Sequence, residues 1–213
     1  MEPTTPDPTK LRHDQSVKQY PHLNLSDSEY VIVVVRRHWM ALIGPMIIGV
    51  ILLVVLWAIQ VNYDVIVQQL NITGIGASST FLLMPIILVT ILVLIGEGAV
   101  YYVYDNNRLF VTNESLIQEI QFSLLAKREQ VIGLENVAEV SFLKSGAFSY
   151  IFNYGTIRMS TVGDEQAYTQ PYVPNPQFVA STITNTVEVF KRIHPEVLNA
   201  EGRDSSGSST VST

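Results

Sequence analysis

The apolar residues of this chain are concentrated in two long runs. Between Trp39 and Val61 there are 23 consecutive uncharged residues, thirteen of which are Leu, Ile or Val. A helix of that length rises about 35 Å, which is enough to cross a hydrocarbon core of about 30 Å. A second run, from Ala77 to Ile95, has 19 uncharged residues. The pattern therefore predicts two transmembrane helices, at about 39–61 and 77–101.

The distribution of basic residues predicts the topology of this hairpin. The segment 62–76 between the two runs carries one charge, Asp64, and no Lys or Arg. Five basic residues precede the first run: Lys10, Arg12, Lys18, Arg36 and Arg37. Since Lys and Arg stay on the cytoplasmic side, we expect a multi-pass protein of the cell membrane with both termini in the cytoplasm.

The cytoplasmic ends of the spans carry residues typical of a membrane interface. Three of them match an aromatic belt: Trp39, Tyr101 and Tyr102. Glu97 adjoins the second span, and an antiparallel hairpin is expected to bring it to the depth of Arg36 and Arg37. We therefore predict an interfacial ion pair. The alternative is a role for Glu97 in a proton or ion pathway.

Composition divides the chain into four regions. Residues 1–28 are polar and rich in proline, and the C-terminal segment 196–213 consists, from residue 199 onward, largely of Ser, Thr and Gly. Neither segment can bury enough apolar surface to offset chain entropy, so both are expected to be disordered. Residues 29–104 hold a juxtamembrane segment and the two spans, which leaves 105–195 as one compact cytoplasmic domain.

The cytoplasmic domain has the pattern of a small sheet followed by one helix. Six short β-rich runs, separated by Asn or Gly, predict strands at 108–112, 116–122, 130–132, 137–143, 156–161 and 167–173. Apolar residues then recur at helical spacing from Val179 to Phe190, with Asn175 as N-cap and Pro195 as the stop. The predicted fold class is α+β, in which the helix covers an open end or face of an antiparallel sheet.

Alternating aromatic residues form a separate pattern: Phe148, Tyr150, Phe152 and Tyr154. In an extended chain all four would share one face, which we expect to lie in the core of the sheet. The alternative is that Phe148 and Tyr150 form an exposed rim that contacts lipid or another subunit.

Charge and motif content exclude several functional classes. The net charge is −6, so the basic surface that nucleic-acid binding needs is missing. The chain has no cysteine, and its four histidines are not at metal-ligand spacing. No phosphate-binding loop or nucleophile motif is present. We therefore predict no catalytic, cofactor or metal residues and no small-molecule substrate, and we expect the protein not to be an enzyme.

One pair of basic residues is a candidate contact. Lys127 and Arg128 are adjacent in a domain whose remaining charges are scattered. They are candidates for contact with a protein partner or an anionic headgroup; the alternative is a solvated turn.

Seven short motifs occur in register with the two spans: Val34–Trp39, Val111–Glu114, Lys127–Glu129, Leu134–Val137, Phe152–Arg158, Thr161–Gly163 and Val173–Pro176. In this order the chain resembles bacterial membrane proteins with a pleckstrin-homology-like (PH-like) domain, over about residues 31–193. The resemblance implies a seven-stranded, strongly bent sheet or partly open barrel, capped by a C-terminal helix and carried on a two-helix anchor. One departure is Ser115, where the family often has a basic residue.

The sequence thus favours a non-enzymatic scaffold or binding protein anchored in the bilayer. The cytoplasmic domain is expected to bind a protein partner, a second copy of itself in a homo-oligomer, or lipid headgroups. The alternative is a subunit of an oligomeric channel or transporter built from the hairpin, since two spans cannot enclose a pore alone.

Overall fold

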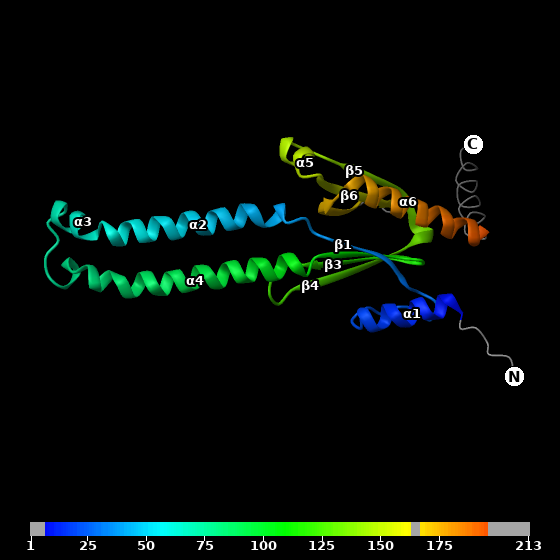
Figure 1. The fold of residues 1–213 in the computed structure, drawn as a ribbon, viewed down its shortest axis with the longest axis horizontal. Helices are drawn as coiled ribbons and strands as arrows, with labels where there is room; N and C mark the ends of the chain where they lie inside the picture. Colours follow the sequence, from blue (N-terminus) through cyan, green and yellow to red (C-terminus); the bar gives the residue numbers. More distant parts are fainter. Residues whose placement is uncertain (1–6, 163–166, 196–213) are drawn as a thin grey trace, which may run out of the picture. The chain divides into compact units, whose positions relative to one another are not determined.

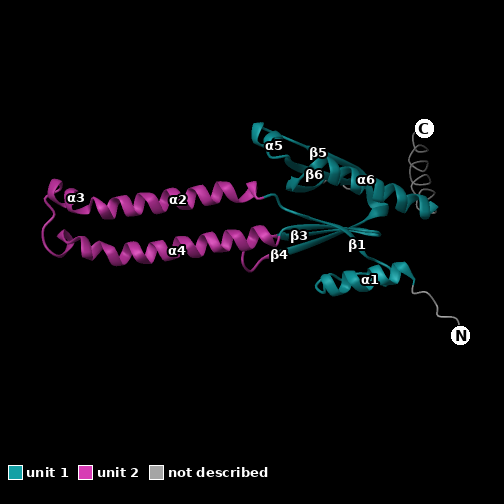
Figure 2. Cartoon of the chain, in the orientation of Figure 1, with its two compact units in different colours: residues 1–38, 107–120, 127–213 teal, residues 39–106, 121–126 magenta. Residues whose placement is uncertain are grey.

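The computed structural model describes residues 7–162 and 167–195. They form two compact units, coloured separately in Figure 2. Unit 1 contains residues up to 38, 107–120 and those from 127 onward, and unit 2 contains 39–106 with 121–126. The predicted C-terminal tail, 196–213, lies outside the described residues.

Unit 2 is built on two long apolar helices that run side by side (Figure 1). They are α2 (Met40–Val61) and α4 (Ser79–Asp105), with mean hydropathies of 2.8 and 2.5, and both are long and apolar enough to cross a membrane. Between them lie a short helix α3 (Tyr63–Gln69) and a turn η1 (Ile75–Ala77). Tyr63 donates a hydrogen bond to the Gly76 carbonyl at 2.6 Å, which ties the two ends of this connection together.

The first sheet of unit 1 has four antiparallel strands in the order β1-β2-β3-β4. Their bounds are β1 (Val31–Arg36), β2 (Arg108–Thr112), β3 (Ser115–Gln121) and β4 (Lys127–Gly133). The composition predicts a juxtamembrane segment at 29–38, but this segment supplies β1, in which Val34 pairs with Phe110. Five consecutive β-branched residues favour a strand there. The sheet domain therefore does not begin at residue 105.

The second sheet has three antiparallel strands in the order β5-β6-β7. After a turn η2 (Leu134–Asn136), its strands are β5 (Val137–Leu143), β6 (Tyr154–Thr161) and β7 (Tyr168–Pro174). The helix α6 (Pro176–Ile193) follows and contacts β5, β6 and η2. Asn175 is at the N-cap, as predicted, but its φ is 44° and its side chain makes no capping hydrogen bond.

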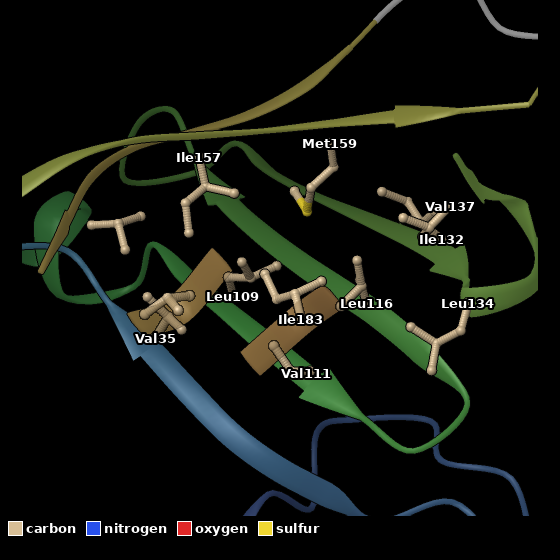
Figure 3. Close-up of a cluster of buried hydrophobic side chains, with 12 residues drawn as sticks. Val35, Leu109, Val111, Leu116, Ile132, Leu134, Val137, Ile157, Met159 and Ile183 are labelled. Atoms are coloured by element: carbon tan, nitrogen blue, oxygen red, sulfur yellow. The ribbon is translucent and has the colours of Figure 1, made fainter. Parts of the chain in front are cut away.

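The hydrophobic core of unit 1 lies where both sheets and α6 contribute side chains (Figure 3). Leu109, Leu116 and Ile157 are fully buried there, together with Met159. Ile183 enters the same cluster from α6, and Val187 and Phe190 pack at its edge. The helical periodicity thus predicted the buried face of α6 correctly. The mixed helix and sheet content is confirmed, and the two antiparallel sheets are not closed into a barrel.

Residues 7–28 are folded, contrary to the prediction of a disordered tail over 1–28, of which residues 1–6 lie outside the described residues. A helix α1 (Pro8–Gln19) begins at Asp7, whose carboxylate accepts a hydrogen bond from the Thr9 amide. On α1, Ser16 is buried, and its hydroxyl accepts from the Val31 amide at the start of β1. Composition alone missed this because the segment uses specific polar contacts with the sheet rather than an apolar face.

A buried carboxylate fastens this segment to the β2–β3 turn. The Glu29 side chain accepts hydrogen bonds from the hydroxyls of Thr112 and Ser115, both at 2.6 Å, and from the Ser26 amide at 3.1 Å. Glu29 is only 5% exposed. Nearby, Leu23 packs against Phe110 on the face of the first sheet that points away from the main core. The segment before β1 is therefore part of the folded unit.

Candidate functional site

A stack of three rings within unit 1 holds the segment that follows β1. The His38 ring stacks on Tyr154 at a centroid distance of 5.3 Å, and Tyr154 stacks on Tyr172 at 5.7 Å. The His38 amide also donates to the Tyr172 carbonyl at 2.5 Å. Tyr172 has a φ of 56°, a left-handed conformation that is costly for a bulky residue. These contacts hold the chain at His38, two residues before α2 begins.

Burial shifts the pKa values of two neighbouring residues in this segment, Arg37 and His38. Partial burial lowers the pKa of His38 below its ordinary value of 6.5. Burial also lowers the pKa of Arg37, and the nearby Tyr172 phenol opposes this effect. Arg36, at the end of β1, is exposed. The two predicted interfacial arginines are therefore in different environments.

The predicted ion pair between Glu97 and Arg36 or Arg37 is wrong. Glu97 instead packs against Gly49 of α2, where a Cβ atom would lie 2.7 Å from the Glu97 carboxyl carbon. Its Oε2 is buried and has no hydrogen-bond partner among the described residues. The reason is the length of α4, which continues to Asp105, about 12 Å beyond Glu97 at ~1.5 Å per residue. The carboxylate therefore lies within the paired helices rather than at their ends.

The three predicted belt aromatics are exposed. Trp39 occupies the N-cap of α2, and Tyr101 and Tyr102 lie in the last turns of α4. Their exposure is compatible with a membrane interface, where an aromatic ring contacts both lipid and headgroups.

Of the two adjacent basic residues, Lys127 forms an ion pair within the chain. Its ammonium lies 2.6 Å from the buried carboxylate of Glu119, which the His22 ring also approaches at 3.4 Å. Arg128 follows on β4 and is exposed. The two residues are thus not a matched pair, because Lys127 compensates the charge of a buried acid.

Phe148 and Tyr150 lie on a short helix rather than on a strand. The N-cap of helix α5 (Ala147–Ile151) is Gly146, which has a φ of 84°, and the Ser149 hydroxyl donates to the Gly146 carbonyl. Phe148 stacks on Phe152, and both Phe148 and Tyr150 are exposed. The predicted alternation into the core is wrong, since one helical turn changes which side chains share a face. The exposure that the alternative requires of Phe148 and Tyr150 is present, and their contact with lipid or another subunit stays a prediction.

A groove runs along α6 beside β5, the outer strand of the second sheet. It has a volume of about 560 Å³ and is called here the β5–α6 groove. Its lining residues are Val137, Ala138, Glu139, Val140, Thr184, Val187, Glu188, Lys191 and Arg192. Apolar side chains alternate with both signs of charge, and the Lys191 ammonium donates to the Val137 carbonyl at 3.2 Å. The groove offers a strand edge beside a small apolar patch.

Sequence reasoning found neither the ring stack nor the β5–α6 groove. His38, Tyr154 and Tyr172 come from three distant segments, and no spacing along the chain relates them. The groove depends on which strand is outermost, which only the pairing of strands decides. Among the described residues, no group of three or more His, Asp or Glu side chains is arranged to hold a metal ion. Comparison of the chain with family models, with curated proteins and with solved structures finds no match.

Proposed function

We propose that this chain is a non-enzymatic, membrane-anchored binding protein that presents its sheet unit to a protein partner on the cytoplasmic side. The observation that carries the proposal is the surface of α2 and α4: only 6% of each most apolar window is buried. So much exposed apolar surface is stable in lipid and would aggregate in water. The hairpin of α2 and α4 therefore serves as the anchor. Unit 1, which holds both sheets and is called here the sheet unit, is then available to contact a protein partner.

The β5–α6 groove is the proposed contact site. An outer strand can add an extended peptide by backbone hydrogen bonding, and a neighbouring apolar patch then selects its side chains. In this groove Val140 and Val187 supply the patch. We propose that the occupant is an extended segment of a protein partner with an apolar side chain against these two residues.

The PH-like resemblance belongs to the same proposal. Seven strands followed by one amphipathic helix, in the described part of the chain, support it. In this proposal the hairpin brings the binding surface to the membrane independently of any headgroup. The mechanism is restriction of the binding unit to the membrane plane, which raises its effective concentration toward other membrane proteins.

Site-specific photocrosslinking in native membranes tests the groove. A photoreactive residue at Ala138, in the groove, is expected to give a discrete adduct, whereas one at Val131, exposed on β4, is not. Val187→Asp is expected to abolish the Ala138 adduct. Equal yields at both positions, or an adduct that persists in Val187→Asp, would contradict the proposed site.

Single cysteines test the topology, because the natural chain has none. A membrane-impermeant maleimide is expected to label Ile75→Cys in intact cells, since Ile75 is exposed in the connection between the spans. Glu114→Cys, in the β2–β3 turn, is expected to react only after the cells are opened. The reverse pattern would place the sheet unit outside and refute the proposed orientation.

A channel or transporter subunit is the second candidate, because Glu97 Oε2 is buried without a partner between two apolar helices. Unpaired acids inside membrane spans commonly mark ion or proton pathways. Two spans cannot enclose a pore, so this candidate requires an oligomer. Cation or proton flux into reconstituted vesicles that is lost in Glu97→Gln would favour it, and vesicles without flux would remove it.

A further inference from the structure

The loop between β3 and β4 carries an apolar tip that the fold leaves uncovered. Its residues 122–126 are called here the β3–β4 loop. Within it Phe122 is 62% exposed, Leu124 52% and Leu125 99%. Three large apolar side chains on five consecutive residues, with no charge among them, are costly at an aqueous surface.

The β3–β4 loop is held in a defined turn. The Phe122 amide donates to the Ala126 carbonyl at 2.9 Å, and the Ala126 amide donates to the Ser123 hydroxyl at 3.2 Å. The Gln121 side-chain amide closes the base by donating to the Ser123 carbonyl at 2.6 Å. The backbone polar groups are thus partly satisfied within the loop, which leaves the tip with apolar side chains directed outward.

The register between β2 and β3 indicates where the β3–β4 loop begins relative to the C-terminal end of α4. Arg108 pairs with Glu119, and the same register continued by two residues would bring Gln121 opposite Asn106. Asn106 is the C-cap of α4. The loop therefore begins at the level where α4 ends, and residues 121–126 belong to the same compact unit as the two apolar helices (Figure 2).

The reach of the loop matches the aromatic belt of α4. Its tip is two to three residues from the strand ends, which corresponds to about 7 to 10 Å at ~3.3 Å per residue. Along α4, 7 Å is about five residues at ~1.5 Å per residue, which runs from Asn106 back to Tyr101. Leu125 thus comes to the depth of Tyr101 and Tyr102, the exposed aromatics of the last turns.

We propose that the β3–β4 loop is a second membrane contact that does not span the bilayer: Phe122, Leu124 and Leu125 insert into the interfacial layer of the leaflet where α4 ends. The inference rests on the proposed anchoring of α2 and α4. Lipid is the occupant because the loop continues the apolar surface of the spans at the same depth. Arg128, which is exposed near the base of the loop, suits the headgroup level of an anionic leaflet.

Such a contact would act together with the spans. The spans fix the chain in the bilayer, and the loop adds a third point that does not lie on either helix. An apolar side chain at the interface is removed from water without requiring backbone to cross the hydrocarbon core. The loop therefore limits the tilt of the β3–β4 hairpin with respect to the membrane.

Depth-dependent fluorescence quenching tests this inference on the full chain in nanodiscs of phosphatidylcholine and phosphatidylglycerol. Single cysteines carry an environment-sensitive dye at Leu125, at Val131 on β4 as the aqueous control, and at Leu88 within α4 as the membrane control. Lipids with a spin label high in the acyl chain are expected to quench Leu125 several-fold more than lipids labelled near the chain end. Aqueous iodide is expected to quench Val131 alone.

The possible outcomes separate this inference from the anchoring on which it rests. Iodide quenching of Leu125, with Leu88 still quenched by lipid, overturns the loop contact and keeps the anchor. Iodide quenching of both positions overturns the anchor as well. Protection of Leu125 from both quenchers means that protein covers the loop, which also overturns the inference.

A second variant guards against an effect of the dye itself. With the dye at Ser123, the substitution Leu125→Asp is expected to reduce quenching by the shallow lipid label several-fold, because a charge is expelled from the interface. Leu125→Met is the matched control and is expected to leave the quenching unchanged. Unchanged quenching in Leu125→Asp would contradict insertion of the loop.

Discussion

The buried carboxylate of Glu29 allows a sharp test of how the N-terminal segment is held. Glu29 accepts three hydrogen bonds, from the Thr112 and Ser115 hydroxyls and from the Ser26 amide. The substitution Glu29→Ala removes all three and leaves two buried hydroxyls without their acceptor. Thr112 keeps one alternative, because its hydroxyl also lies 2.9 Å from the Ser115 carbonyl.

The expected cost follows from these contacts. A hydrogen bond to a charged group contributes about 1.5 to 3 kcal/mol, and a buried donor left unsatisfied costs about 1 to 3 kcal/mol. The three bonds are not additive, because Thr112 is rescued in part and because water reaches the exposed Ser28 beside the site. We therefore expect Glu29→Ala to lower the free energy of unfolding of unit 1 by about 2 to 4 kcal/mol. Glu29→Gln keeps an oxygen acceptor and is expected to lose less than half as much.

Urea unfolding of the detergent-solubilised protein, followed by far-UV circular dichroism, measures the loss. Hydrogen exchange of the Ser115 amide, which donates to Thr112 Oγ1 at 2.7 Å, reports the β2–β3 turn directly. The exchange is expected to accelerate in Glu29→Ala. The reasoning is refuted if Glu29→Ala unfolds like the natural chain, or if Glu29→Gln is as damaging as Glu29→Ala.

Three further predictions follow from the structure: two concern close contacts at glycine residues, and the third concerns the titration of His38. Gly155→Ala is expected to lower stability by about 1 to 3 kcal/mol in the same unfolding assay, because its Cβ would lie 2.6 Å from the Leu143 carbonyl oxygen, which cannot move aside; wild-type stability would contradict this. Gly49→Leu is expected to cost about 1 to 3 kcal/mol, and a double-mutant cycle with Glu97→Ala is expected to recover at least ~0.5 kcal/mol, whereas additive losses would exclude the contact. The His38 ring is expected to titrate below 6.5 by NMR, because burial disfavours its cation. Its contribution to stability is then complete above pH 6.5 and is lost as the pH falls toward the lowered pKa; a midpoint at or above 6.5 would argue against it.

Local pattern was sufficient for the long helices and most strands. The strands at 108–112 and 137–143 were predicted with the bounds that the structure has, because alternation and flanking turn residues act within a few residues. The buried face of α6 was predicted from the spacing of Val179, Ile183 and Val187. Two apolar runs of sufficient length determined the helical hairpin, since length and hydropathy are properties of the segment alone.

Segments whose structure depends on a distant partner were not predictable in this way. Residues 31–36 form β1 because they pair in antiparallel fashion with β2, which follows more than 70 positions later in the chain. The segment 1–28 is ordered from α1 onward by contacts with Glu29 and the β2–β3 turn. The alternating aromatic residues from Phe148 are typical of a strand, yet Gly146, with its positive φ, precedes one helical turn there. In each case a long-range contact or a single backbone angle outweighed local preference.

The candidate sites show the same division between features that local sequence determines and features that depend on long-range contacts. The sequence by itself determined which residues are apolar enough to enter a bilayer and where aromatic residues flank them, because those properties belong to each side chain. Only the tertiary structure decided that Glu97 meets Gly49, that β5 is an outer strand beside α6, and that residues 121–126 cluster with the two apolar helices. These facts depend on helix length, strand order and register, which are settled when segments far apart in the chain pack together.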